Sequence, residues 1–166
     1  MIRSIADFIP VWNREADSTK SLFRGLADTA MHQSVTAEHR DLGRLAWHIT
    51  TTIREMMERT GLHVEGPDPD APVPTSAAEI VSAYETSASS LVTALGAWTD
   101  ATLAEKDNMY GEEWTRSFTL QALLFHQTHH RGQMTVLMRQ AGLPVPGMYG
   151  PTKEDWAKYG MPAPAV

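Results

Sequence analysis

The chain has 166 residues, 42% of them hydrophobic, a formal net charge of −6 and no cysteine. This size and composition predict a single domain over residues 1–166 with one substantial core. The absence of cysteine excludes disulfides, a nucleophilic thiol and thiolate metal sites. No basic stripe is present to neutralise phosphates, and no apolar run is long enough to cross a bilayer, so we expect neither nucleic acid nor a membrane as partner. The N-terminus does not resemble a secretory signal, and we expect a cytoplasmic protein.

Two amphipathic helices are predicted in the first third of the chain. Apolar residues recur at helical spacing after Asp7, which is a candidate N-cap, and this helix is expected to end at residues 25–27. Residues 28–40 lack a sustained period and predict a connection. Asp41 is the N-cap candidate of a second helix, and Gly61 is typical of the residue just beyond a helix end.

Two more helices are predicted after a linker. Residues 61–75 contain four prolines and two glycines, and a linker of this length could cross the whole bundle, so the second and third helices could run parallel. The third helix is expected from residues 75–76 to Trp98, and the fourth from residues 117–119 to Ala141. Residues 99–116 suggest a folded connection that could hold a strand pair. The apolar residues almost all round the fourth helix predict a central position or contact with a second subunit.

The fourth predicted helix carries two histidines, His126 and His130, one turn apart on one face. Two imidazoles in this arrangement can bind one metal ion, and His48 in the second helix is the best candidate for a third ligand. Gln127 stands where a zincin would need glutamate, which excludes that peptidase class. A di-iron bundle would need repeated Glu-x-x-His, which is absent. The alternative is a pair of core histidines held by hydrogen bonds.

The segments LGRLAWHI and FHQTHHRGQMTVLMRQAGLPVPGMYGP resemble the two signature regions of the DinB/YfiT-like family. The resemblance extends along essentially the whole chain. It implies an all-α fold, a four-helix bundle with a long crossover between helices 2 and 3. It also implies a single divalent metal bound by three histidines, which correspond to His48, His126 and His130. Family members are often dimers, and a homodimer is therefore expected.

Three neutral ligands and an open fourth position are typical of a catalytic metal site, and imidazole suits zinc and nickel alike. The resemblance favours a metal-dependent thiol S-transferase or detoxification enzyme that joins a low-molecular-weight thiol to an electrophile. Because the chain has no cysteine, the thiol must be external. A metal-dependent hydrolase and a non-catalytic, stress-associated metal-binding protein are the alternatives. No catalytic residue beyond the ligands is predicted, although Gln133 could hydrogen-bond a ligand and His129 could serve at a surface or interface.

Overall fold

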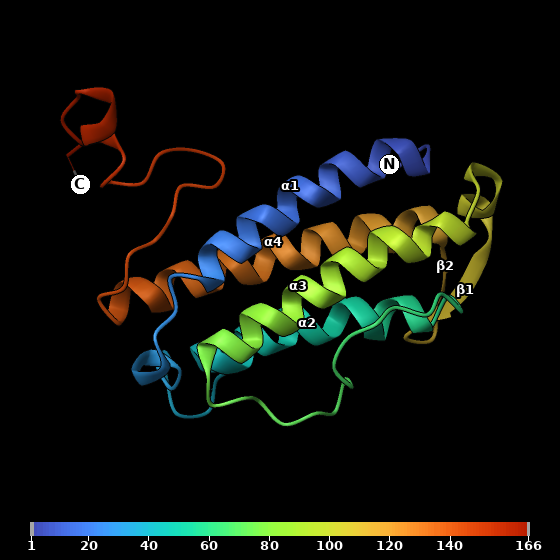
Figure 1. The fold of residues 1–166 in the computed structure, drawn as a ribbon, viewed down its shortest axis with the longest axis horizontal. Coiled ribbons are helices and arrows are strands. Elements are labelled where there is room, and N and C mark those ends of the chain that lie inside the picture. Colours follow the sequence, from blue (N-terminus) through green and yellow to red (C-terminus); the bar gives the residue numbers. More distant parts are fainter. Residues whose placement is uncertain (1, 166) are drawn as a thin grey trace.

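The computed structural model describes residues 2–165, and four long helices dominate it (Figure 1). The predicted all-α class is confirmed, and the possible strand pair is present as one short antiparallel hairpin. The main elements are α1 (Ile5–Phe23), α2 (Leu42–Glu58), α3 (Ala77–Ala94), β1 (Lys106–Met109), β2 (Glu112–Thr115) and α4 (Arg116–Gln140). Short 3-10 helices occupy Asp28–Ala30, Leu95–Ala97, Asp100–Ala104 and Trp156–Tyr159. Within residues 2–165, no helix is long and apolar enough to cross a membrane.

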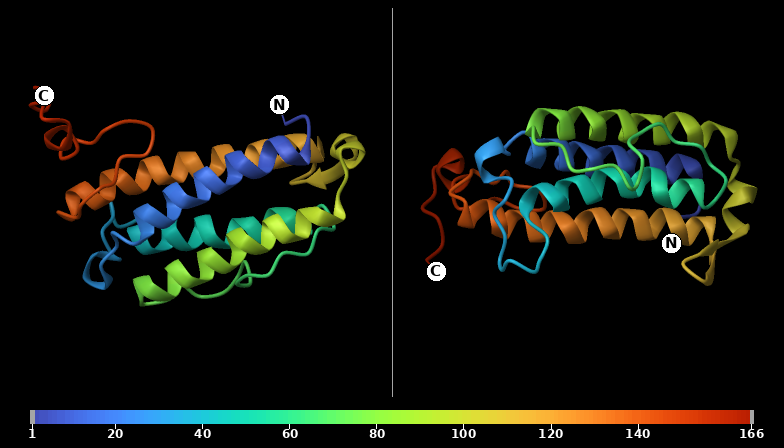
Figure 2. Two further views of the ribbon diagram at one scale, coloured as in Figure 1. Left: turned by 45° about the horizontal axis from the view of Figure 1, so that its top comes forward. Right: turned by 90° about the horizontal axis from the view of Figure 1, so that it is seen from below.

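The direction of the helices determines which residues meet across the bundle. In Figures 1 and 2, α1 and α4 run one way and α2 and α3 run the other way. The segment between α2 and α3 passes back along α2, where Arg54 donates to the Gly66 carbonyl at 3.1 Å and Trp47 donates to the Ala71 carbonyl at 2.9 Å. Since α2 and α4 are antiparallel neighbours, the N-terminal half of α2 lies beside the C-terminal half of α4.

The start of α1 differs from the prediction. The helix begins at Ile5, because the Ser4 hydroxyl accepts a hydrogen bond from the Asp7 amide at 2.9 Å and caps the first turn. Pro10 therefore lies inside the helix, where it removes one backbone hydrogen bond to Ala6. Both residues are exposed, so water can satisfy the free carbonyl. Asp41 does cap α2, as predicted, by accepting from the Arg44 amide at 2.8 Å.

The core fills the space between all four helices. Trp12 of α1 is fully buried, and its indole N–H donates to the Ala88 carbonyl of α3 at 3.0 Å. Phe23 packs edge to face on Tyr84, joining the same two helices. The side chains that α2 and α4 contribute are similarly enclosed: Leu42, Ile49, Ile53, Met57, Leu120, Leu123, Met134 and Met138. This packing makes a rigid frame for the polar groups that lie between α2 and α4.

A buried ion pair joins α1 to α4, and nothing in the sequence periodicity predicted it. The Arg131 guanidinium is 1% exposed and donates to the carboxylate of Glu15 and, at 3.1 Å, to the hydroxyl of Thr19. Tyr149, from the segment after α4, accepts from Arg131 at 2.6 Å and donates to Glu15. This network therefore fixes the C-terminal segment to two helices.

Candidate metal centre

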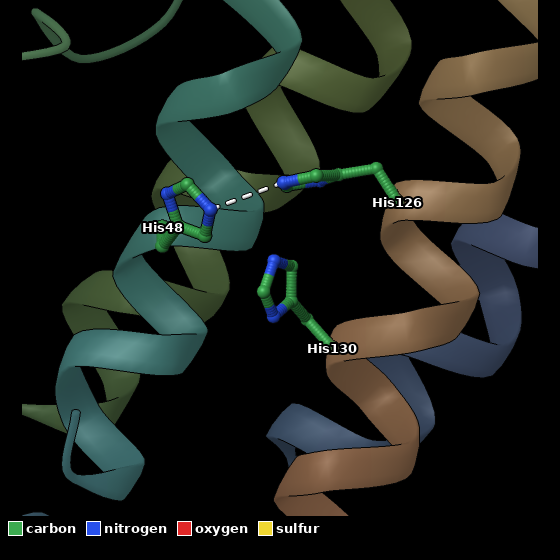
Figure 3. A group of neighbouring side chains, drawn as sticks. All are labelled: His48, His126 and His130. Atoms are coloured by element: carbon green, nitrogen blue, oxygen red, sulfur yellow. Dashed lines mark hydrogen bonds between the residues drawn. The ribbon is translucent and has the colours of Figure 1, made fainter. Parts of the chain in front are cut away.

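The structure brings His48, His126 and His130 together between α2 and α4 (Figure 3). His48 projects from α2, and the other two project from successive turns of α4. One ring nitrogen from each residue lies within 4.8 Å of the others. The antiparallel packing of α2 and α4 explains the meeting, because it places the middle of α4 opposite the first half of α2. The three predicted residues thus form one cluster that could hold a metal ion.

The spacing of the imidazoles is close to that of histidines that bind the same metal ion. The Nε2 atoms of His48 and His126 are 3.0 Å apart, and the ring of His130 stands edge to face against both, at centroid distances of 4.7 and 4.4 Å. Two nitrogens bound tetrahedrally to zinc at about 2.05 Å are roughly 3.3 Å apart. The His48 and His126 nitrogens are therefore already near coordinating distance, and all three ligand atoms lie within 4.8 Å of one another.

Gln133 fixes the tautomer of His130. Its side-chain oxygen lies 2.7 Å from Nδ1 of His130, and its amide nitrogen lies 3.2 Å from Nε2 of His129. Because a carbonyl oxygen only accepts, Nδ1 of His130 carries the proton and donates. The lone pair of His130 is then on Nε2, and metal-binding histidines are commonly held by such a second hydrogen bond. The sequence suggested that Gln133 could hydrogen-bond a metal ligand, and the structure shows it accepting from His130, one of the three candidate ligands.

Gln127 holds the two helices at a fixed separation beside the site. Its side chain is fully buried, donates to the Ile49 carbonyl of α2 at 2.9 Å and accepts from the Tyr84 hydroxyl of α3 at 3.1 Å. Gln127 follows His126 directly, and Ile49 follows His48. The same residue whose identity excluded the zincin class therefore positions two of the three histidines. No sequence pattern indicates this role, because it depends on contacts across three helices.

The histidines are suited to bind a cation as neutral ligands. Burial lowers the pKa of His48 to about 4, with a further contribution from the charge of Arg40. Burial and the neighbouring His130 and His48 lower the pKa of His126 to about 3. Burial also lowers the pKa of His130. The three rings are consequently neutral at neutral pH, and one of the Nε2 atoms of His48 and His126 donates a hydrogen bond to the other. Nδ1 of His126 is buried without a hydrogen-bond partner in the described residues. The donor set fits a divalent metal that accepts nitrogen ligands.

Other polar residues considered from the sequence lie outside the cluster. His129 is exposed on α4 and contacts only the edge of the site through Gln133. Glu55 is engaged at the far end of α2, where it accepts from Arg59 at 2.6 Å and from Tyr110 at 2.7 Å. The remaining histidines, His32, His39 and His63, are exposed. Among residues 2–165, no carboxylate joins the three imidazoles as a ligand.

Comparison with known proteins gives concordant matches over the whole chain. The DinB family profile matches residues 1–164. The uncharacterized protein YrdA of Bacillus subtilis (strain 168) is 46% identical over 167 residues, which cover all of both chains. The crystal structure of a DinB-like protein from Bacillus cereus ATCC 10987 is 44% identical, has a TM-score of 0.86 and covers 90% of this chain and 100% of its own. A DinB-like protein of B. subtilis, YjoA, shares the fold, with a TM-score of 0.65 at 18% identity, covering 83% of this chain and 96% of its own.

Proposed function

Because the chain belongs to the DinB family, we propose that His48, His126 and His130 bind one divalent metal ion in a thiol S-transferase. The observation that carries this proposal is the convergence of three imidazole nitrogens within 4.8 Å, with no carboxylate ligand among the described residues. Imidazole ligands suit zinc and nickel alike. A divalent ion bound by three neutral ligands keeps its full charge and can hold an external thiol as the nucleophilic thiolate.

The protein orients the histidine ligands and fixes the distance between the helices that carry them. Gln133 keeps the Nδ1 proton on His130, so that Nε2 faces the cluster, and Gln127 fixes the spacing of α2 and α4. The chain has no cysteine, so the nucleophilic sulfur must come from a small-molecule thiol, which then attacks an electrophile. Glu55, at the far end of α2, is paired with Arg59 and is not placed to activate water. The transferase is therefore preferred to a hydrolase that uses bound hydroxide.

The proposal extends to the architecture and assembly. The segment that returns along α2 supports the long crossover that the resemblance implied between helices 2 and 3. A homodimer is supported by exposed apolar residues on α4, since Phe118, Phe125 and Val136 are 45%, 63% and 54% exposed. With Ala122, His129 and Gly132 they form a row spaced alternately by four and three residues, as in paired helices. We call these six residues the α4 seam, and a second copy is its proposed occupant.

A thiol-transfer assay tests the proposed reaction. Protein loaded with zinc or nickel is incubated with 2-mercaptoethanol and 1-chloro-2,4-dinitrobenzene, and formation of the thioether is followed by absorbance. We expect the metal-loaded protein to exceed the uncatalysed rate and the His126→Ala variant to lose this excess. The same proteins are given p-nitrophenyl acetate without thiol. Metal-dependent ester cleavage combined with no thiol transfer would replace the transferase with the hydrolase.

A further inference from the structure

A pocket of about 580 Å³ opens beside the three histidines. Its walls come from the connection before α2 and from the facing sides of α2 and α4. Most of its surface is apolar, while a guanidinium, an imidazole, a carboxylate and an amide contribute the polar part. The lining residues are Val35, Glu38, His39, Arg40, Leu45, Gln133, Val136 and Leu137. This volume lies in the range of small-molecule sites.

The pocket is next to the proposed metal centre along both helices. Leu45 precedes His48 by three residues on α2, and Gln133 follows His130 by three residues on α4. Because these helices are antiparallel, both steps of about one turn, roughly 5 Å, lead toward the same end of the bundle. Gln133 also contacts His130 directly. A molecule in this pocket would therefore lie about one helical turn from the three histidines, with Gln133 between it and His130.

The wall formed by residues 35–40 is attached to the start of α2. The Leu42 amide donates to the Gln33 carbonyl at 2.9 Å, and the Gly43 amide donates to the Met31 carbonyl at 2.8 Å. A Cβ atom at position 43 would lie 3.3 Å from the same Met31 carbonyl and 2.9 Å from its Sδ-methyl group. Glycine at position 43 thus permits the close approach that holds this connection over the pocket.

The pocket lining holds two charged groups without an ion-pair partner within residues 2–165, the Glu38 carboxylate and the Arg40 guanidinium. Arg40 forms no ion pair or hydrogen bond with any residue between 2 and 165, whereas Glu38 accepts from the Thr36 hydroxyl at 3.4 Å and His39 contacts that hydroxyl at 2.6 Å. The guanidinium therefore lines the pocket and remains free to pair with an anion.

We propose that this pocket binds a small amphipathic carboxylate, with its apolar body against Val35, Val136 and the two leucines and its carboxylate on Arg40. Arginine recognises carboxylates through two parallel N–H donors, and the apolar walls exclude water from the rest of the molecule. The role of this molecule as a cosubstrate rests on the proposed function. Binding of the carboxylate does not, because Arg40 and the apolar walls are independent of any metal.

The probe pair 4-phenylbutyrate and 4-phenylbutyramide tests the pocket, because the two molecules differ only in the carboxylate. Calorimetry on metal-free and zinc-loaded protein should show the carboxylate binding about threefold to tenfold more tightly than the amide, as one partly exposed charge pair would give. Arg40→Gln should remove this preference without weakening the amide, and Arg40→Lys should restore part of it. Arg44→Gln is the matched control, since Arg44 is exposed on the first turn of α2 and does not line the pocket.

Methyl NMR spectra locate the probe. Shifts of the Val35 and Val136 methyl signals, with Val11 unchanged, are expected. Equal affinity of the two probes for the wild type, or a preference that survives Arg40→Gln, would overturn the proposal. Zinc content measured on the same samples separates the two hypotheses: a carboxylate preference in protein that cannot retain metal removes the transferase and keeps the pocket. Protein that retains metal but does not prefer the carboxylate removes the pocket proposal and keeps the transferase.

Discussion

The side-chain oxygen of Gln133 accepts a hydrogen bond from Nδ1 of His130 at 2.7 Å, one turn along α4. This bond leaves Nε2 of His130 as the nitrogen that can bind a cation. Replacement of Gln133 by leucine keeps the size of the side chain and removes the acceptor. We expect zinc affinity to fall about 10-fold, in the range found when partners of metal ligands are removed.

Competition with a chromophoric chelator measures this affinity. Gln140→Leu is the control, because Gln140 is an exposed glutamine in the last turn of the same helix. Equal zinc affinity of the Gln133→Leu variant and the wild type would show that the hydrogen bond does not support the ligand.

The buried pair of Glu15 and Arg131 should stabilise the fold. Replacement of Glu15 by glutamine leaves the guanidinium buried without its counter-charge, and we expect the free energy of unfolding to fall by about 3 kcal/mol at pH 7. Urea denaturation followed by circular dichroism measures the change. Asp17→Asn is the control, since Asp17 lies on the same helix and pairs with Lys20 at the exposed surface. A loss no greater than that of the control would contradict a stabilising role.

The same pair predicts how stability depends on pH. Burial alone would raise the pKa of Glu15, but hydrogen bonds from Tyr149 and Arg131 outweigh it and hold the pKa below its ordinary value. A lowered carboxyl pKa contributes stability above the unfolded-state pKa, about 4.3, and the contribution is lost as the pH falls through the folded-state pKa. The difference in melting temperature between wild type and Glu15→Gln should therefore be largest near pH 7 and shrink below about pH 4. A constant difference from pH 3 to 7 would exclude this origin.

If two copies assemble through the α4 seam, one charged substitution in the seam should abolish the dimer. Phe125 is 63% exposed in the middle of the row, so glutamate at this position would place a charge in the dimer contact. We expect the wild type to sediment as a dimer and Phe125→Glu as a monomer with unchanged helical content. Val11→Glu, on an exposed position of α1, is the control. A monomeric wild type at 100 µM, or a dimeric Phe125→Glu, would refute the seam.

Local patterns predicted the helices well because α2 carries a strong N-cap and a clear apolar period, and α4 is a long run of helix-compatible residues that is apolar almost all round. The meeting of His48 with His126 required the antiparallel pairing of α2 and α4, and the resemblance to a known family supplied that arrangement. Ser4 and Asp7 are both good N-cap residues, and the prediction of Asp7 was wrong. A start at Asp7 would have kept Pro10 within the first turn, where proline costs little. Pro10 is tolerated inside α1 because it is exposed and water can satisfy the free carbonyl of Ala6.

The residues that were missed act across helices. Arg131 lies in no motif that the sequence offers, and only the packing of α1 on α4 places it against Glu15. In the sequence, Gln127 serves only to exclude a zincin, which would need glutamate at this position. Its contacts with Ile49 and Tyr84 depend on the packing of three helices. A helical period indicates which face is buried. It does not indicate which polar group of another helix will lie opposite.

The metal content of the purified protein tests the central claim most directly. Wild type and His126→Ala are purified without chelator, incubated with excess zinc, desalted and measured by inductively coupled plasma mass spectrometry, with circular dichroism to verify the fold. We predict about one zinc per wild-type chain and almost none in the variant, because two imidazoles hold the ion poorly. A wild-type protein that retains no metal, or a folded His126→Ala variant that retains as much as the wild type, would contradict the three-histidine centre.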